Sequence, residues 1–293
     1  MSYVTVLGSL HLDIVVEAPR QPGLGETLMG SGWRQVAGGK GLNQAVSCAK
    51  AGLETRMLGL VGNDGFADTL LGHLQKHQVD TQQVLRVDNC GSGMSVAIVQ
   101  SDGDYAAVVA SEANLLLNDS HVKAWSDLLA ASSALVLQNE IPAAVNLEAA
   151  KIVATAGGLV ILNAAPAREA DSVFFKHVSV LIVNSVEAEM MGSKPVLNLS
   201  SAQDASDYLH KTFGPDVVVT AGKDGAAWTG SDTQNGGGSG SISALPVKVI
   251  SAHGAGDTFV GCLVAELVRG QSLGAAVKAS NKAAALYVST PRA

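Results

Sequence analysis

The chain contains few aromatic residues, few charged residues and only three cysteines, and each shortage excludes a class of protein. Of its 293 residues, 4% are aromatic and 15% are charged, with a formal net charge of -7. A negative chain without a basic cluster is a poor nucleic-acid or membrane-surface binder. Cys48, Cys90 and Cys262 are too widely spaced for a disulfide framework or a zinc site, so we expect buried, reduced thiols.

Targeting signals and long hydrophobic runs are missing as well. The first ten residues place no positive charge ahead of a long apolar stretch, and no apolar segment is long enough to span a bilayer. We therefore expect a cytoplasmic protein that binds neither membranes nor nucleic acids. With 47% hydrophobic residues the chain can bury a large core, and we expect a single domain over residues 1–293.

Short runs that are apolar throughout alternate with stretches of helical spacing. Such runs are typical of strands buried on both faces. The alternation predicts an α/β fold with a mostly parallel central sheet, helices on both faces, and ligands beyond the carboxyl ends of the strands. We predict strands at 4–7, 135–137, 159–162, 180–183 and 217–220, and helices at 43–51, 66–77, 145–156 and 202–213.

Two segments, 27–35 and 92–110, do not fit this alternation of buried strands and helices. Both read as alternating, partly polar strands, the second with an internal turn at 101–104. We expect a small separate β-sheet, drawn from about residues 14–36 and 92–110, that acts as a lid over the cleft or as a pairing surface. The glycine-rich stretch 235–240 predicts a flexible surface loop.

The sequence Gly254-Ala255-Gly256-Asp257, just before an apolar run, combines an anion cradle with a carboxylate. Small residues at a helix start leave backbone N–H groups available to a phosphate. A carboxylate beside a bound phosphate makes chemical sense if it takes a proton from the attacking group. The structural alternative is that the glycines form a turn and Asp257 caps the helix.

A second glycine-rich turn, at residues 37–44, leads into a helix. Gly39 would let a ligand approach the backbone, while Lys40 and Asn43 offer polar contacts. The Gly-x4-Gly-Lys-Ser/Thr spacing of a Walker A loop is absent. The structural alternative is a helix N-terminus with a solvated lysine.

Polar residues also follow the first predicted strand and the strand at 135–138. His11 and Asp13 alternate, so in a strand both side chains would point to the same side. The G-x-G-x-x-G fingerprint is missing from this turn, which argues against an NAD enzyme. Glu140 adds an acid at another strand end. The structural alternative for His11 is a satisfied histidine in the core.

Asn184 and Glu187 follow the strand at 180–183, where their oxygens could organise a magnesium ion directly or through water. The structural alternative is a capping box, with Asn184 as the N-cap residue. Two further turns, 163–167 and 220–225, also follow predicted strands. Together these turns mark one ligand-binding edge of the sheet.

These motifs resemble those of the ribokinase family, also called the PfkB-type carbohydrate kinases, over essentially the whole chain. The most specific matches are Gly38-Gly39-Lys40-Gly41-x-Asn43-Gln44 and Gly254-Ala255-Gly256-Asp257-Thr258-Phe259, while Asn184-x-x-Glu187 looks like the family's magnesium and phosphate motif. The resemblance implies a ribokinase-like fold, ATP and Mg²⁺ as cofactors, and transfer of the γ-phosphoryl group to a hydroxymethyl oxygen of a pentose such as ribose or a related sugar.

The resemblance also implies a role for each matching residue. Asp257 would be the catalytic base, and the backbone of Gly254, Ala255 and Gly256 would form the anion hole. The residues that would hold the sugar are His11, Asp13, Gly39, Lys40, Asn43, Glu140 and Asp257. The residues that would line the nucleotide site are Asn184, Thr220, Gly222 and Asn281, with Glu187 near Mg²⁺ through water.

The chain departs from the family at two places. Ribokinases usually carry an asparagine where this chain has His11, so ribose itself is less secure than a sugar kinase. Family members activated by a monovalent cation generally have an acid three residues ahead of the glycine turn, where this chain has Ser251. The chain also ends at Ala293, short of the tail that usually completes the cation loop. Dependence on K⁺ is therefore doubtful.

Two other functions remain as alternatives. A nucleoside kinase on the same scaffold needs an apolar or aromatic platform for the base, which the 4% aromatic content disfavours. A catalytically silent sugar-binding regulator would not need Asp257 together with Lys40 and Glu187. We also expect a homodimer that forms through an exposed edge of the lid sheet.

Overall fold

The computed structural model describes residues 3–100, 104–169, 172–231 and 238–291. Residues 101–103 of the turn predicted at 101–104 lie outside the described residues, as do 235–237 of the loop predicted at 235–240 and the last two residues. The loop prediction is wrong for 238–240, which begin a strand. Within the described ranges, no helix combines the length and the apolar character needed to cross a membrane.

Nine strands form one large sheet in the order β13-β12-β11-β10-β9-β8-β1-β4-β5. The strands from β11 through β5 run parallel, whereas β12 and β13 add an antiparallel edge. The predicted α/β fold with a mostly parallel sheet is confirmed. The strands are β1 (Val4–Leu7), β4 (Thr55–Gly62), β5 (Asp80–Val87), β8 (Ala134–Gln138), β9 (Leu159–Asn163), β10 (Val180–Asn184), β11 (Asp216–Thr220), β12 (Gly225–Gly230) and β13 (Gly238–Ser243).

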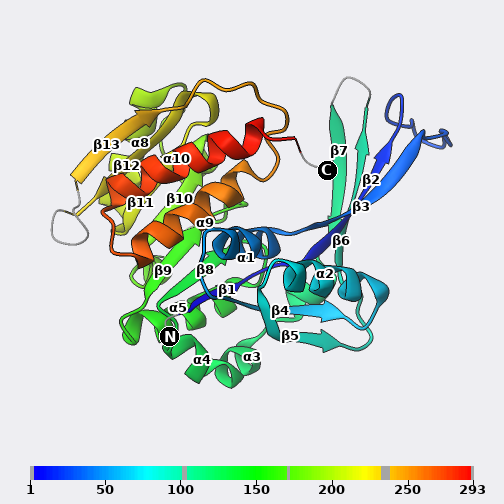
Figure 1. The fold of residues 1–293 in the computed structure, drawn as a ribbon, viewed down its shortest axis with the longest axis horizontal. Coiled ribbons are helices and arrows are strands. Elements are labelled where there is room, and N and C mark those ends of the chain that lie inside the picture. Colours follow the sequence, from blue (N-terminus) through cyan, green and yellow to red (C-terminus); the bar gives the residue numbers. More distant parts are fainter. Residues whose placement is uncertain (1–2, 101–103, 170–171, 232–237, 292–293) are drawn as a thin grey trace.

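Helices cover both faces of the large sheet (Figure 1). One face is covered by α1 (Lys40–Lys50), α2 (Gly65–Lys76), α9 (Ala255–Val268) and α10 (Leu273–Ser289). The other face is covered by α3 (Asp119–Ala124), α4 (Ser126–Ala130), α5 (Ala143–Thr155), α6 (Ser172–Phe175), α7 (Ser185–Met190) and α8 (Leu199–Phe213).

Successive residues of the central strands enter opposite cores. Val4 and Val6 of β1 pack with the helices around α9, whereas Leu7 packs with those around α5. Val218 and Val219 of β11 divide in the same way. Because both faces are buried, these strands are apolar throughout, which is the pattern that identifies them in the sequence.

A second sheet of four strands, ordered β3-β2-β6-β7, projects from the large one (Figure 1). Its strands are β2 (His11–Glu17), β3 (Gly32–Gly38), β6 (Gly93–Val99) and β7 (Tyr105–Ala110). The predicted strand at 27–35 is wrong at its start, because residues 27–31 form no strand and β3 continues to Gly38. The antiparallel register with β2 sets both ends of β3, because Gly32 pairs with Glu17 at the end of β2 and Gly38 pairs with His11 at its start.

Candidate active site

Polar residues, several of them predicted, come together where the parallel strands end. Ser9 and Glu140 follow β1 and β8, while Asn163, Asn184 and Thr220 lie at the ends of β9, β10 and β11. These five strands are consecutive neighbours in the sheet. The residues therefore form one row along the edge where parallel α/β sheets bind their ligands.

The start of α1 is held tightly against the end of β1. Gly39 has a φ of +90°, a backbone conformation that other residues rarely adopt. A Cβ on Gly41 would lie 2.5 Å from the Ser9 backbone nitrogen, so a side chain there would collide with the turn. The Glu140 carboxylate accepts a hydrogen bond from Lys40 N at 2.9 Å and another from the Ser9 hydroxyl. Glu140 thus anchors the first turn of α1.

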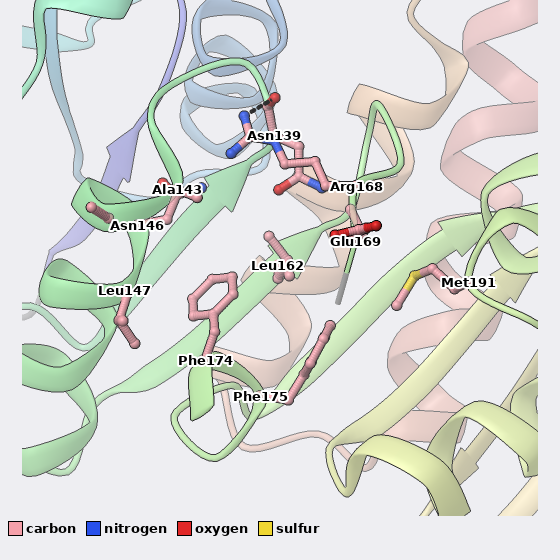
Figure 2. A pocket seen from close by; sticks show the side chains of 12 residues that line it. Asn139, Ala143, Asn146, Leu147, Leu162, Arg168, Glu169, Phe174, Phe175 and Met191 are labelled. Atoms are coloured by element: carbon pink, nitrogen blue, oxygen red, sulfur yellow. Dashed lines mark hydrogen bonds between the residues drawn. The ribbon is translucent and has the colours of Figure 1, made fainter. Parts of the chain in front are cut away.

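Arg168 holds the loop that carries Glu140 (Figure 2). Its Nη2 donates to the carbonyl oxygen of Ile141 at 2.6 Å and to that of Asn139, one on each side of Glu140. A cavity of about 300 Å³ lies between α5 and α6, and its lining, which includes Leu162, is mostly apolar. Figure 2 shows the side chains that line it. None of the predicted site residues lines this cavity, which lies on the sheet face covered by α5.

His11 and Asp13 lie on one face of β2, as their alternation predicts. His11 is buried, with Nδ1 3.8 Å from the Glu140 carboxylate. Burial lowers the pKa of His11, although the charges of Glu140 and Asp13 oppose this, so the imidazole is neutral at pH 7. Asp13 accepts a hydrogen bond from the Ser95 hydroxyl, and a Cβ on Gly38 would lie 2.2 Å from Asp13 Oδ2.

Asp257 is the third residue of α9, and Gly254 occupies the N-cap position with a left-handed φ of +79°. Asp257 is therefore not the cap residue that the structural alternative required. Its Oδ1 accepts a hydrogen bond from Gln44 Nε2 at 3.0 Å. Burial raises the pKa of Asp257, while hydrogen bonds from Gln44 and Asn43 and the charge of Lys40 act in the opposite direction.

The glycine turn before α9 carries the predicted anion hole. The first N–H groups of any helix lack partners within the helix, so they are available to a ligand. The Ala255 N–H is an exception here, because it donates to Ala252 O at 3.2 Å. One of the three backbone donors predicted at Gly254, Ala255 and Gly256 is thus engaged within the protein.

Asn184 and Glu187 form the capping box that the structural alternative predicts. Asn184 Oδ1 accepts from Glu187 N at 2.9 Å, and Glu187 Oε2 accepts from Asn184 N at 2.8 Å. Only one carboxylate oxygen of Glu187 takes part in the box. Burial raises the pKa of Glu187, and the backbone bond from Asn184 and the charge of Lys40 oppose this. Lys40 therefore acts on the carboxylates of both Glu187 and Asp257.

Three of the four residues predicted for the nucleotide site lie near one another. Asn184 and Thr220 are register partners on β10 and β11, and Gly222 follows in a short helical turn, Gly222–Asp224. Asn281 is buried in α10, where its Nδ2 donates to Ser243 O on β13 at 2.9 Å. This hydrogen bond ties Asn281 to the antiparallel edge of the sheet.

Three amide side chains that the sequence did not assign to the site, two of them fully buried, connect these parts. Gln44 bonds Asp257, Asn163 and Gln138, which come from three different elements. The available signals for Gln44 were its place in the motif of residues 38–44 and its position four residues after Lys40, on the same helical face. Asn163 and Gln138 carry no signal beyond their positions at strand ends.

A carboxylate beside a glycine-rich helix start and a lysine, at the carboxyl edge of a parallel sheet, is typical of an α/β phosphotransferase. The chain belongs to the pfkB family of carbohydrate kinases, whose family model matches residues 1–293. It is therefore an ATP-dependent sugar kinase.

Individual relatives agree with this assignment. The chain is 32% identical over 288 residues to a ribokinase of Bacillus subtilis, covering 98% of this chain and 93% of the relative. It is 29% identical over 276 residues to a deoxyribokinase of Salmonella typhi, covering 94% and 89%. The structure of Arabidopsis thaliana ribokinase complexed with ribose and ATP superposes with a TM-score of 0.89 at 28% identity, covering 100% of this chain and 95% of that one.

The pKa shift of Asp257 predicts how stability responds to removal of its charge. Because the pKa is raised on folding, ionisation of Asp257 costs stability as the pH rises from its unfolded to its folded pKa. Asp257→Asn should therefore raise the melting temperature at about pH 7. The gain should disappear below about pH 4, where the wild-type carboxyl is protonated in both states. Thermal unfolding over a pH series measures this, and a pH-independent difference would contradict it.

Proposed function

We propose that the protein transfers the γ-phosphoryl group of ATP to a hydroxymethyl oxygen of a pentose such as ribose or a related sugar. The attacking oxygen forms a bond to the γ-phosphorus as the bond to the β–γ bridging oxygen breaks and ADP leaves. Asp257 takes the hydroxyl proton. The backbone N–H groups of the turn at Gly254, Ala255 and Gly256 face the phosphoryl group, although Ala255 must first release its internal bond.

The environment of Asp257 is the single observation that carries this proposal. Asp257 is a half-buried carboxylate at a helix start, bonded by two amides and facing a lysine, and these partners favour its ionised form and hold it in place. A base of this kind needs an elevated pKa that still leaves it ionised at neutral pH. Burial raises the pKa, and Gln44, Lys40 and Asn43 oppose that rise.

The sugar would lie between the two sheets. The predicted sugar contacts come from the base of β2, the start of α1 and the loop after β8, and the projecting sheet would close over them as a lid. A closed lid excludes water that would otherwise hydrolyse ATP. We assign the sugar contacts to His11, Asp13, Gly39, Lys40, Asn43, Glu140 and Asp257.

The nucleotide would lie beyond the ends of β10 and β11, with Asn184, Thr220, Gly222 and Asn281 as its contacts. The donor set fits magnesium held mainly by phosphates and water, because Mg²⁺ needs only one or two protein carboxylates when a nucleotide is bound. Glu187 would hold the ion through water. When bound, Mg²⁺ would neutralise phosphate charge. Ser251 stands where family members activated by a monovalent cation carry an acid, so we assign no requirement for K⁺.

The chemistry of the relatives favours a pentose. One relative is named ribokinase and another deoxyribokinase. Deoxyribose differs from ribose by a single hydroxyl, so a change of one contact could switch the preference of the enzyme from one sugar to the other. His11 is the departure from the family pattern among the sugar contacts, and it lies beside Glu140 as a neutral imidazole. We propose that His11 helps to select the sugar.

We further propose that the chain acts in the cytoplasm as one kinase domain and pairs with a second copy through the lid. One face of the lid sheet carries Val16, Trp33, Ile98, Val96 and Val108, since the register aligns them in adjacent rows. Trp33 is 66% exposed and Val108 is 75% exposed. A contiguous apolar face of this kind is characteristic of an interface.

Loss of the Asp257 carboxylate should abolish turnover but leave the fold intact. We expect Asp257→Asn to lower kcat by about three orders of magnitude or more, because the proton acceptor is removed while the bond from Gln44 can persist. ADP release over a panel of sugars and nucleosides, with and without K⁺, measures the loss and identifies the substrate. Asp119→Asn changes an acid in the first turn of α3 and should have no effect. Near-normal turnover of Asp257→Asn would rule out the assigned base.

Replacement of His11 should alter the choice of sugar. We expect His11→Asn to change the ratio of kcat/KM between two pentoses by roughly tenfold, the effect of one polar contact. The KM for ATP should stay within about threefold of wild type, because His11 lies on the sugar side of the site. An unchanged ranking of sugars would show that His11 does not select the substrate.

A charge on the apolar lid face should separate the proposed dimer. We expect Trp33→Lys to convert a dimer into a monomer in light scattering, because lysine would be desolvated at the interface. Leu197→Lys, at a residue that is 78% exposed and lies just before α8, is the matched control and should remain dimeric. A monomeric wild-type protein would contradict this proposal.

A further inference from the structure

Gln44 is a fully buried amide at the centre of the site. Its side-chain oxygen accepts one hydrogen bond and its side-chain nitrogen donates two. Its Oε1 accepts from Gln138 Nε2 at 2.8 Å. Its Nε2 donates to Asn163 Oδ1 at 2.9 Å and to Asp257 Oδ1 at 3.0 Å. These bonds join β8, β9 and α9 through one residue of α1.

The neighbours of Gln44 leave its amide one orientation. Asn163 donates its own Nδ2 to the carbonyl of Ile182 at 3.3 Å, so its Oδ1 is the atom that faces Gln44. Gln138 presents its Nε2 from the other side. A flipped Gln44 would place oxygen against the oxygens of Asn163 and Asp257 and nitrogen against a donor. The backbone of β10 therefore determines, through Asn163, that Gln44 offers a donor to Asp257.

A donor fixed in this way has two consequences for Asp257. It restricts rotation of the carboxylate, because Oδ1 is tied to a side chain that is itself held at three points. It also favours the ionised form, and among the groups that oppose the effect of burial on the pKa of Asp257, Gln44 is the largest. Asn43 and Lys40 act in the same direction, whereas the charge of Glu140 acts with burial.

We propose that Gln44 is a positioning residue for phosphoryl transfer: its amide fixes the orientation of the Asp257 carboxylate. This inference rests on the proposed function, in which Asp257 is the base. Gln44 does not itself need to touch either substrate.

Replacement of Gln44 by an apolar residue of similar size tests the proposal. Gln44→Met should lower kcat by about tenfold or more, the effect of one hydrogen bond to a charged group, with the KM for sugar and for ATP within about threefold. The acid limb of the kcat/KM profile should move to higher pH. The ¹³C signal of the Asp257 carboxyl should titrate at higher pH in the same variant, a readout that does not require turnover.

Two further variants separate positioning from stability. Gln44→Glu keeps the size of the side chain but sets a second carboxylate beside Asp257, so the Asp257 titration should move further upward. If Gln44→Met does not fold, the Asp257 titration in Gln44→Glu tests the positioning role instead. Asn146→Leu is the matched control, because it removes a buried amide that donates to Gln138 O at 2.7 Å without contacting Asp257. It should lower the melting temperature and leave the Asp257 titration unchanged.

The outcomes distinguish this inference from the proposed function. If the wild-type protein phosphorylates a sugar but both Gln44 variants keep the wild-type titration and kcat, the positioning role is overturned and the kinase assignment stands. If Asp257→Asn retains turnover, the base assignment is overturned, and an altered ¹³C titration in Gln44→Met then supports only an electrostatic contact.

Discussion

The contact between the start of α1 and the end of β1 is the constraint on which the site depends. Glycines at positions 39 and 41 allow the two backbones to meet, and the Glu140 carboxylate accepts a hydrogen bond from the backbone N–H of Lys40. Arg168 in turn holds the loop around Glu140. Because α1 is rigid, this one anchor sets where its side chains reach, including the lysine that acts on two carboxylates and the glutamine that reaches α9.

Buried charge is the second organising feature, and it is balanced rather than avoided. Asp257 and Glu187 both have raised pKa values because of burial, and Lys40 opposes the shift in each. An unpaired carboxylate in such a place would remain protonated. Amide side chains, which hydrogen bond without adding charge, complete the balance around Asp257. The amides and Lys40 thus favour the ionised form of Asp257 against the effect of burial.

Much of the fold, and the clustering of most polar residues of the candidate site, followed from the sequence. Fully apolar runs identified β1, β8, β9, β10 and β11, because burial on both faces leaves no place for polar residues. The lid strands were less well bounded, since an exposed sheet has no such pattern and its register depends on a partner strand. The edge strands β12 and β13 were not predicted either: β13 alternates half-buried and exposed residues, whereas β12 is mostly buried but consists largely of glycine and alanine.

The sequence by itself determined the class of the protein and the identity of the main polar residues, since motifs such as residues 38–44 and 254–259 carry their chemistry in local spacing. Only the tertiary structure showed which of these residues cap a helix. Asp257 is not a cap because Gly254 takes that position, whereas Asn184 and Glu187 do form a capping box. The network through Gln44, Asn163 and Gln138 could not be read from the chain, because Gln44 is more than ninety residues from the other two and meets them only when β8 and β9 are paired against α1.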